Sequence, residues 1–250
     1  MNFISIAYAV FLPVVLLIYW TVPARYRTYT LLAASYVFYG AWDYRFLALV
    51  WVSTIVDFGV ANALGATDEQ AKRRRLLWLS LGVNLGILGY FKYSGFFVDS
   101  AHEMLSRVGL DASIGTLEIL LPVGISFYTF QTMSFSIDVY RRVVEPERRL
   151  DVFALYVAVF PQLVAGPIER ASRLLPQLRA LPGRMPADHL RSGFRLLAFG
   201  VVQKVILADM VAPHVNDVYA DPGSASTLGA VVGIVGFSIQ IYGDFAGYSN

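Results

Sequence analysis

Apolar stretches recur from one end of the chain to the other, separated by short polar and charged connections. We predict membrane segments at residues 3–20, 28–42, 46–64, 76–91, 119–137, 152–168, 196–211 and 228–243. Crossing a bilayer core of about 30 Å takes roughly 20 helical residues, so the shorter stretches either thin the bilayer or do not cross it. The runs lack strand-type alternation, and only helices or closed barrels satisfy the backbone in lipid. The pattern therefore predicts an all-α bundle.

Composition supports a membrane protein. Of 250 residues, 56% are hydrophobic and only 15% are charged, whereas a soluble domain carries about 25% charged residues. The net charge of +2 gives no basic field for nucleic acid, so we expect no such partner. The absence of cysteine excludes disulfide scaffolds, thiolate-bound metals and thiol nucleophiles. No linker divides the chain, and we predict a single membrane domain over residues 1–250.

The distribution of basic residues predicts the orientation. Most Lys and Arg residues fall in groups around Arg25, Arg73, Arg148 and Arg179. The positive-inside rule places these groups on the cytoplasmic side. The uncharged N-terminus and the acidic connection at Asp221 then face the opposite side.

The segment at 152–168 does not fit simple alternation, because basic groups flank it on both sides. It also contains Pro161, Gly166 and Pro167, and proline removes a helical hydrogen bond and clashes with the preceding turn. We interpret it as a re-entrant or broken helix with both ends cytoplasmic. A kinked spanning helix is the alternative. The resulting bundle has about seven spanning helices plus this broken one.

Ionisable residues within apolar segments are candidates for function, since they are costly in lipid. We interpret Asp57 and Lys204 as structural, either as members of buried pairs or with the charge extending to the membrane surface. For Asp244, a structural role and a functional role are given equal weight. Lys204 and Asp209 lie five residues apart, which is too far for an ideal pair on one helix face. We expect each to find partners on other helices.

Uncharged polar residues suggest a tunnel. Residues expected to line a tunnel or cavity are Gln131, Gln162, Asp244, Tyr248 and Ser249. Gln162 lies in the broken segment, where irregular backbone is tolerated only inside protein or along a cavity. Hydrogen bonds between helices are the alternative role for such side chains.

Histidine is the usual general base, and the chain has three: His102, His189 and His214. All three are predicted in or beside loops, where we interpret them as ordinary solvated side chains. No metal-ligand spacing is present, and no metal site is expected.

Several longer motifs resemble the membrane-bound O-acyltransferase family, in its bacterial polysaccharide branch. These motifs are ASYVFYG at 34–40, GYFKY at 89–93, LPVGISFYTFQTMSFSIDVYR at 121–141, FPQLVAGP at 160–167 and QIYGDFAGYS at 240–249. The similarity extends over the whole chain in the family's order.

The resemblance implies a multi-pass protein of the bacterial cytoplasmic (inner) membrane. Such a protein transfers an acyl group, here acetyl, across the membrane for O-acetylation of an exported polysaccharide such as alginate. The resemblance implies no bound cofactor. The implied donor is acetyl-CoA or another acyl thioester, and the implied partners are an extracytoplasmic acetyltransferase or esterase-like protein and the polysaccharide acceptor.

The chain also departs from the family pattern. The family's catalytic histidine lies in the later half, and none of the three histidines here matches its motif. We therefore expect an N-terminal half whose catalytic histidine lies beyond Asn250, with no catalytic residue in this chain and no activity of the chain alone. The alternatives are a non-catalytic channel-like or scaffold subunit and D-alanyl transfer to teichoic acid.

Overall fold

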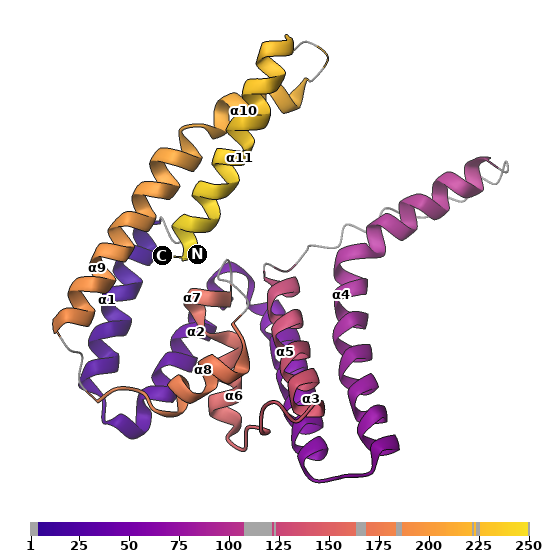
Figure 1. Cartoon of the computed structure of the whole chain (residues 1–250), viewed down its shortest axis with the longest axis vertical. Coiled ribbons are helices and arrows are strands. Elements are labelled where there is room, and N and C mark those ends of the chain that lie inside the picture. The colour runs from indigo at the N-terminus through magenta and orange to yellow at the C-terminus, as the bar shows by residue number, and fades with distance from the viewer. Residues whose placement is uncertain are drawn as a thin grey trace. The chain divides into compact units, whose positions relative to one another are not determined.

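The computed structural model describes residues 5–107, 122, 124–163, 169–183, 187–221, 223 and 226–249. Helices dominate these ranges, and no strand occurs in them (Figure 1). The prediction of an all-α chain is therefore confirmed.

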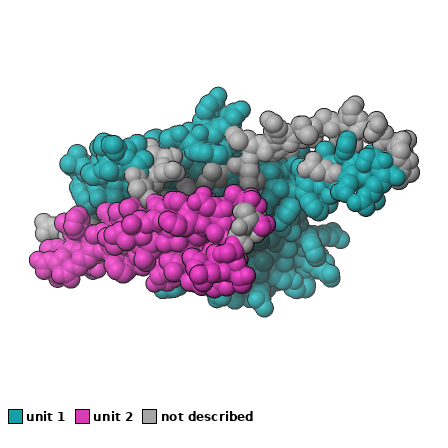
Figure 2. Space-filling model, turned by 90° about the horizontal axis from the view of Figure 1, so that it is seen from above, with its two compact units in different colours: residues 1–164, 168–181 teal, residues 165–167, 182–250 magenta. Residues whose placement is uncertain are grey.

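The chain divides into two compact units, which Figure 2 colours separately. Unit 1 comprises residues 1–164 and 168–181, and unit 2 comprises residues 165–167 and 182–250. That the whole chain forms a single membrane domain stays a prediction.

Unit 1 contains the longer series of helices. In chain order they are α1 (Ile6–Thr21), η1 (Ala24–Tyr26), α2 (Arg27–Asp43), η2 (Tyr44–Phe46), α3 (Leu47–Gly65), α4 (Gln70–Arg107), α5 (Ile125–Tyr140), α6 (Leu150–Ala158), α7 (Phe160–Leu163) and α8 (Ala171–Arg179). Unit 2 contains α9 (Ala187–Val202), η3 (Gln203–Asp209), α10 (Ala212–Ala220) and α11 (Thr227–Ser249). The segment η3 is a π-helix that directly follows α9.

The first three helices lie close to their predicted segments, but others differ. Helix α4 continues through charged residues at both ends of its predicted segment at 76–91. The predicted segment at 119–137 begins outside the described residues. Helices α8 and α10 and the first turns of α9 lie where connections were predicted, because their polar residues interrupt the apolar runs used for prediction.

Three helical stretches among the described residues are long and apolar enough to cross a membrane. They are Ala24–Gly65, which includes both α2 and α3, Ala187–Ala220 and Thr227–Ser249. Ile6–Thr21 and Leu150–Leu163 are apolar but shorter. The predicted number of crossings stays a prediction.

Large apolar side chains cover much of the outer surface of these helices. Ile6 and Leu17 on α1 are 85% and 68% exposed, and Leu228 on α11 is 74% exposed. Soluble monomers rarely expose large continuous apolar patches. Outward-facing apolar side chains instead suit contact with lipid.

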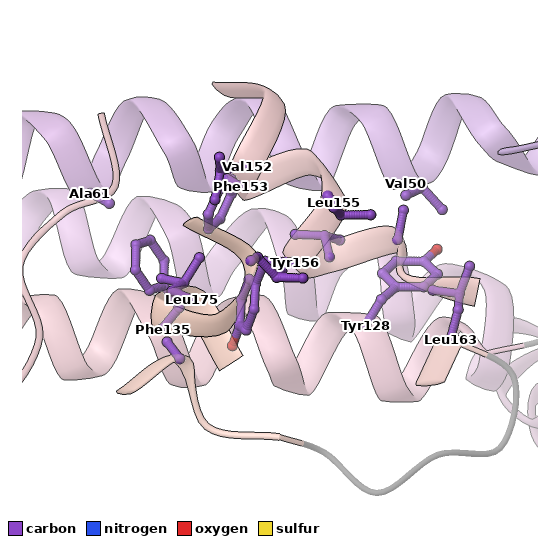
Figure 3. Close-up of a cluster of buried hydrophobic side chains, with 14 of the residues drawn as sticks. Val50, Ala61, Tyr128, Phe135, Val152, Phe153, Leu155, Tyr156, Leu163 and Leu175 are labelled. Carbon is purple, nitrogen blue, oxygen red and sulfur yellow. The ribbon is translucent and has the colours of Figure 1, made fainter. Parts of the chain in front are cut away.

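Helix α6 forms the centre of unit 1. Every residue from 152 to 158 is at most 1% exposed, as expected of a helix that is hydrophobic on all sides. Figure 3 shows Phe153 and Tyr156 of α6 close to Phe135 of α5 and Leu175 of α8. The ring centroids of Phe135 and Phe153 lie 4.8 Å apart. Protein therefore surrounds this short apolar helix.

The predicted break after α6 is present. Val159 leaves the helical conformation, with φ −56° and ψ 116°, and the single turn α7 follows. Gly124, at the start of α5, has φ +76°, and a Cβ there would overlap the carbonyl of Leu163. The broken helix is thus packed tightly against α5. That the segment is re-entrant stays a prediction, and residues 164–168 lie outside the described residues.

Candidate functional site

A fully buried polar network joins α3, α4 and α5. The carboxylate of Asp57 on α3 accepts hydrogen bonds from Ser80 Oγ (2.5 Å) and Asn84 Nδ2 (2.8 Å), both on α4. Ser136 Oγ on α5 donates a third bond, at 3.2 Å. Thr132 Oγ1 donates to Asn84 Oδ1 at 3.3 Å, which connects the amide to α5 as well. All five side chains are inaccessible to solvent.

These described partners of Asp57 are all neutral, so the group is not half of an ion pair. Hydrogen bonds between neutral polar side chains commonly connect membrane helices. The structural interpretation of Asp57 is therefore supported, although by a network rather than a charged partner. Ser80, Asn84 and Ser136 were not singled out in the sequence, but the four-residue spacing of Ser80 and Asn84 in an apolar run was a usable signal.

The break between α6 and α7 explains the environment of Gln131. In a continuous helix, the N–H of Phe160 would donate to the carbonyl of Tyr156. Instead, the N–H of Phe160 donates to Ser35 Oγ on α2, at 3.2 Å. The side chain of Gln131 donates to the freed carbonyl of Tyr156 at 2.7 Å. Two polar side chains thus replace the pairing that the break removes.

Gln131 also brings the second predicted residue of unit 1 into contact. Gln162 on α7 donates from Nε2 to Gln131 Oε1, at 3.1 Å. Gln131 is buried and Gln162 is half-buried. The structure therefore places these two predicted residues together beside the broken helix.

A tunnel around these residues stays a prediction. A depression in unit 1 lies between α3 and α4, and its lining is apolar. The residues that line it are Ile55, Val56, Gly59, Val60, Leu76, Leu79 and Val83. Because it includes neither Gln131 nor Gln162, it is not the predicted tunnel.

The other predicted residues lie on α11 in unit 2. Asp244 pairs with Lys204 of η3, with Oδ1 2.6 Å from Nζ. Tyr248 is half-buried and Ser249 is exposed, about one turn further along α11. Gly247, between them and Asp244, would place a Cβ 2.9 Å from the carbonyl oxygen of Gly200. Helix α11 therefore approaches the α9–η3 backbone closely next to the ion pair.

The pair Lys204–Asp209 corrects the expectation that these two residues are too far apart to pair, whereas the ion pair of Lys204 with Asp244 confirms the expected partner of Lys204 on another helix. Lys204 Nζ lies 2.5 Å from Asp209 Oδ1, so these residues are partners although five positions separate them. The reason is the π-helix η3, in which hydrogen bonds run from i to i+5 and residues five apart face the same side. Lys204 thus joins two carboxylates, one from its own segment and one from α11. Single π-turns within helices often occur at functional sites.

The histidines are also placed differently from the prediction. His102, His189 and His214 lie within α4, α9 and α10 rather than in loops. All three are exposed, in agreement with their interpretation as ordinary surface side chains. No group of three or more metal-binding side chains was found among the described residues.

Charged side chains form hydrogen bonds and ion pairs at the ends of several unit 1 helices. The buried guanidinium of Arg73 donates to the carbonyls of Leu64 on α3 and Tyr140 on α5, which are unpaired acceptors at helix C-termini. Arg179 Nε pairs with the buried Glu147 at 2.6 Å. Nearby, a hydrogen bond from Arg149 lowers the pKa of Asp151.

The amino-acid sequence of the chain is similar to those of several known proteins. No family model matches the chain. The chain is 39% identical over 244 residues to the probable alginate O-acetylase AlgI of Azotobacter vinelandii, covering 96% of this chain and 48% of that protein. The same protein of Pseudomonas aeruginosa is 39% identical over 96% of this chain and 46% of its own length. A peptidoglycan O-acetyltransferase of Helicobacter pylori is 29% identical over 88% of this chain and 46% of its own length.

The chain spans about half the length of these curated relatives. The similarity nevertheless extends over nearly all of its own residues, across both units, and the apolar helices agree with a multi-pass membrane protein. Over nearly all of its own length, the chain is therefore a homologue of the alginate O-acetylases, which agrees with its resemblance to the membrane-bound O-acyltransferase family.

Proposed function

We propose that this chain is part of a membrane O-acetylase of the bacterial inner membrane, acting on exported alginate or a closely similar polysaccharide. The observation that carries the proposal is the 39% identity to alginate O-acetylases over 96% of the chain. The multi-helix membrane architecture supports it, because an acyl donor in the cytoplasm and an exported acceptor lie on opposite sides of the bilayer.

The donor in this proposal is acetyl-CoA or another acyl thioester. Overall, the carbon–sulfur bond of the thioester breaks, its sulfur leaves as a thiolate, and an ester forms at the oxygen of a sugar hydroxyl. A base takes the hydroxyl proton and passes it to the thiolate, which leaves as the free thiol. An extracytoplasmic acetyltransferase or esterase-like protein would receive the acetyl group before the polysaccharide. A positioned base contributes about 10²–10⁴-fold to such transfers.

Within this reaction, we assign the lining of an acyl path, rather than the base, to polar residues of each unit taken by itself. Gln131 and Gln162 provide amide groups beside the broken helix, and Asp244, Tyr248 and Ser249 follow one another on the last part of α11. Polar groups of this kind at membrane depth suit the lining of a path that lipid does not reach. The histidines lie on exposed helix faces, and Asp57 accepts hydrogen bonds from Ser80, Asn84 and Ser136, so we assign the catalytic base to none of them and propose that the chain alone is inactive.

Peptidoglycan is the second acceptor to consider, because the relative from Helicobacter pylori is 29% identical over 88% of the chain. D-Alanyl transfer has weaker support: the Streptococcus thermophilus teichoic acid D-alanyltransferase is 26% identical over only 54% of the chain. A non-catalytic scaffold remains the alternative from another functional class.

The test uses a hybrid protein, in which these 250 residues replace the matching half of the Azotobacter vinelandii alginate O-acetylase. Inverted membrane vesicles carrying the hybrid, from a strain without its own alginate O-acetylase, receive radiolabelled acetyl-CoA. We expect alkali-labile label on the enclosed alginate. No label above that of vesicles without the hybrid, at a normal level of membrane-inserted hybrid, would favour the scaffold.

A further inference from the structure

The C-terminal part of α4 contains none of the residues that we assign to the acyl path. Helix α4 is not among the three stretches long and apolar enough to cross a membrane, but it contains the predicted membrane segment at 76–91. Between Arg75 and Lys92 the helix has no charged residue, as expected within a bilayer. The helix then continues to Arg107. Its 38 residues correspond to about 57 Å, whereas the hydrocarbon core is about 30 Å thick. The final turns, residues 96–107, therefore extend past the apolar segment.

One apolar stripe continues from the bilayer segment into this extension. Tyr90, Tyr93, Phe97 and Met104 follow one another at intervals that place them on one helix face. Their side chains are exposed, from 45% at Tyr93 to 71% at Met104. The side of α4 that faces outward along its apolar segment thus stays apolar and exposed along the extension.

The opposite side of the extension is polar and satisfies its own charges. His102 and Ser106 are exposed there, whereas Glu103 and Arg107, also exposed, lie on the flank between that side and the apolar stripe. Glu103 and Arg107 form an ion pair at 2.5 Å, and Ser106 Oγ donates to the carbonyl of Glu103 at 2.9 Å. Phe97 and Met104 thus lie opposite His102 and Ser106, while Phe96, which is 65% exposed, shares the flank with Glu103. The extension is therefore amphipathic, with one apolar residue on its polar flank.

The helix also changes direction before the extension. Figure 1 shows the last part of α4 leaning away from the axis of its first part. In the sequence, Ser94 and Gly95 directly precede residues 96–107, and Gly/Ser pairs are common sites of helix kinks. A Cβ at Gly95 would meet nothing within 4 Å, so close packing does not explain this glycine.

We propose that residues 96–107 lie in the interface between lipid headgroups and acyl chains, on the side of the membrane opposite the turn at 66–69. Phe97 and Met104 then insert into lipid, while His102 and Ser106 face water, as in other amphipathic interfacial helices. Lipid is the occupant because the stripe continues the outward face of the bilayer segment. The tyrosines at the junction also match the aromatic belt of a membrane interface.

Site-directed spin labelling tests this placement, and the chain has no native cysteine to remove. Single cysteines at Phe97, Met104, His102 and Ser106 are labelled in the full chain, reconstituted in phosphatidylethanolamine–phosphatidylglycerol vesicles. We expect labels at 97 and 104 to be relaxed more by oxygen than by a water-soluble nickel chelate. The labels at 102 and 106 should show the reverse. Equal access of nickel to all four labels would overturn the proposal, as would shielding of 97 and 104 from both reagents, which indicates a protein partner.

A paired substitution separates lipid contact from helix stability. With a label at Ala101, Phe97→Glu combined with Met104→Glu should move the label toward the aqueous reagent. The matched pair His102→Glu with Ser106→Glu should leave its depth unchanged. Equal shifts for the two pairs, or no shift for either, would contradict insertion through the apolar face.

Discussion

At the scale of single residues, polar side chains of unit 1 form hydrogen bonds with buried groups that would otherwise lack a partner. These groups are backbone atoms at the helix break and the carboxylate of Asp57. Gln131 and Ser35 take over hydrogen bonds that the break at Val159 removes, and Asp57 is satisfied by neutral donors from two other helices. The sequence predicted that Gln131 and Gln162 mattered, because amides are rare in apolar segments. It did not predict their mutual contact, which depends on how α5 packs against α7.

Removing the carboxylate of Asp57 should destabilise unit 1. Asp57→Leu leaves buried donors of Ser80, Asn84 and Ser136 without an acceptor, and an unsatisfied buried group costs about 1–3 kcal/mol. Asp57→Asn retains an oxygen acceptor and the side-chain shape, so this variant should lose less stability than Asp57→Leu. The fraction of folded chain in mild detergent, followed on heating, measures both variants. Equal behaviour of the leucine and asparagine variants would show that the network contributes nothing.

Gln162→Leu in the hybrid should lower acetyl transfer more than it lowers the level of membrane-inserted protein. The reason is that Gln162 donates to Gln131 beside the broken helix, where we place the acyl path. Gln177→Leu is the matched control, because Gln177 is exposed and donates within α8 to the carbonyl of Arg173. Parallel loss of activity and abundance in the Gln162 variant would instead indicate a packing role alone.

At the scale of elements, the sequence predicted apolar helices well and special helix geometry poorly. The runs that became α1, α2 and α3 are continuous and apolar, so their existence followed from composition. The π-helix η3 was not predicted, because no residue type marks the change from α-helical to π-helical hydrogen bonding. That change reversed the expectation for Lys204 and Asp209. Amphipathic α8 was missed because its arginines indicated a loop.

Close packing between α11 and the α9–η3 segment should depend on Gly247. A Cβ there would lie 2.9 Å from the carbonyl oxygen of Gly200 and 3.1 Å from the backbone nitrogen of Lys204. Neither backbone atom can move easily, so Gly247→Leu should destabilise unit 2 by about 1–3 kcal/mol, as overpacking does elsewhere. Gly82→Leu on α4, where a Cβ meets nothing within 4 Å, is the control. Thermal unfolding in detergent gives the melting temperatures of the two variants. Equal melting temperatures would contradict the close approach of α11 to the α9–η3 backbone.

At the scale of the whole molecule, the charge distribution predicts which connections share a side of the membrane. Cysteines at Arg74 and Arg179 should react with an impermeant thiol reagent only after the cells are opened. A cysteine at Asp221 should react in intact cells. Arg74 is preferable to Arg73, whose side chain is buried. Labelling of residue 179 in intact cells would contradict a re-entrant segment at 152–168.

The family was predictable from the sequence because its motifs are long and occur in order. The division into two compact units was not, since no linker or change of composition marks it near residue 182. Activity of the hybrid is the property that tests the molecule as a whole.

Ester-linked acetate on exported alginate is the most direct measurement of the proposed function. A strain lacking its own alginate O-acetylase receives either the hybrid or the 250-residue chain alone. We predict that the hybrid restores acetylation. The chain alone should not, because we assign the catalytic base neither to the histidines, which lie on exposed helix faces, nor to Asp57, which accepts hydrogen bonds from three neighbouring side chains. Unacetylated alginate from cells with a normal level of membrane-inserted hybrid would contradict the proposed function, and acetylated alginate from cells with the chain alone would contradict the absence of a catalytic base.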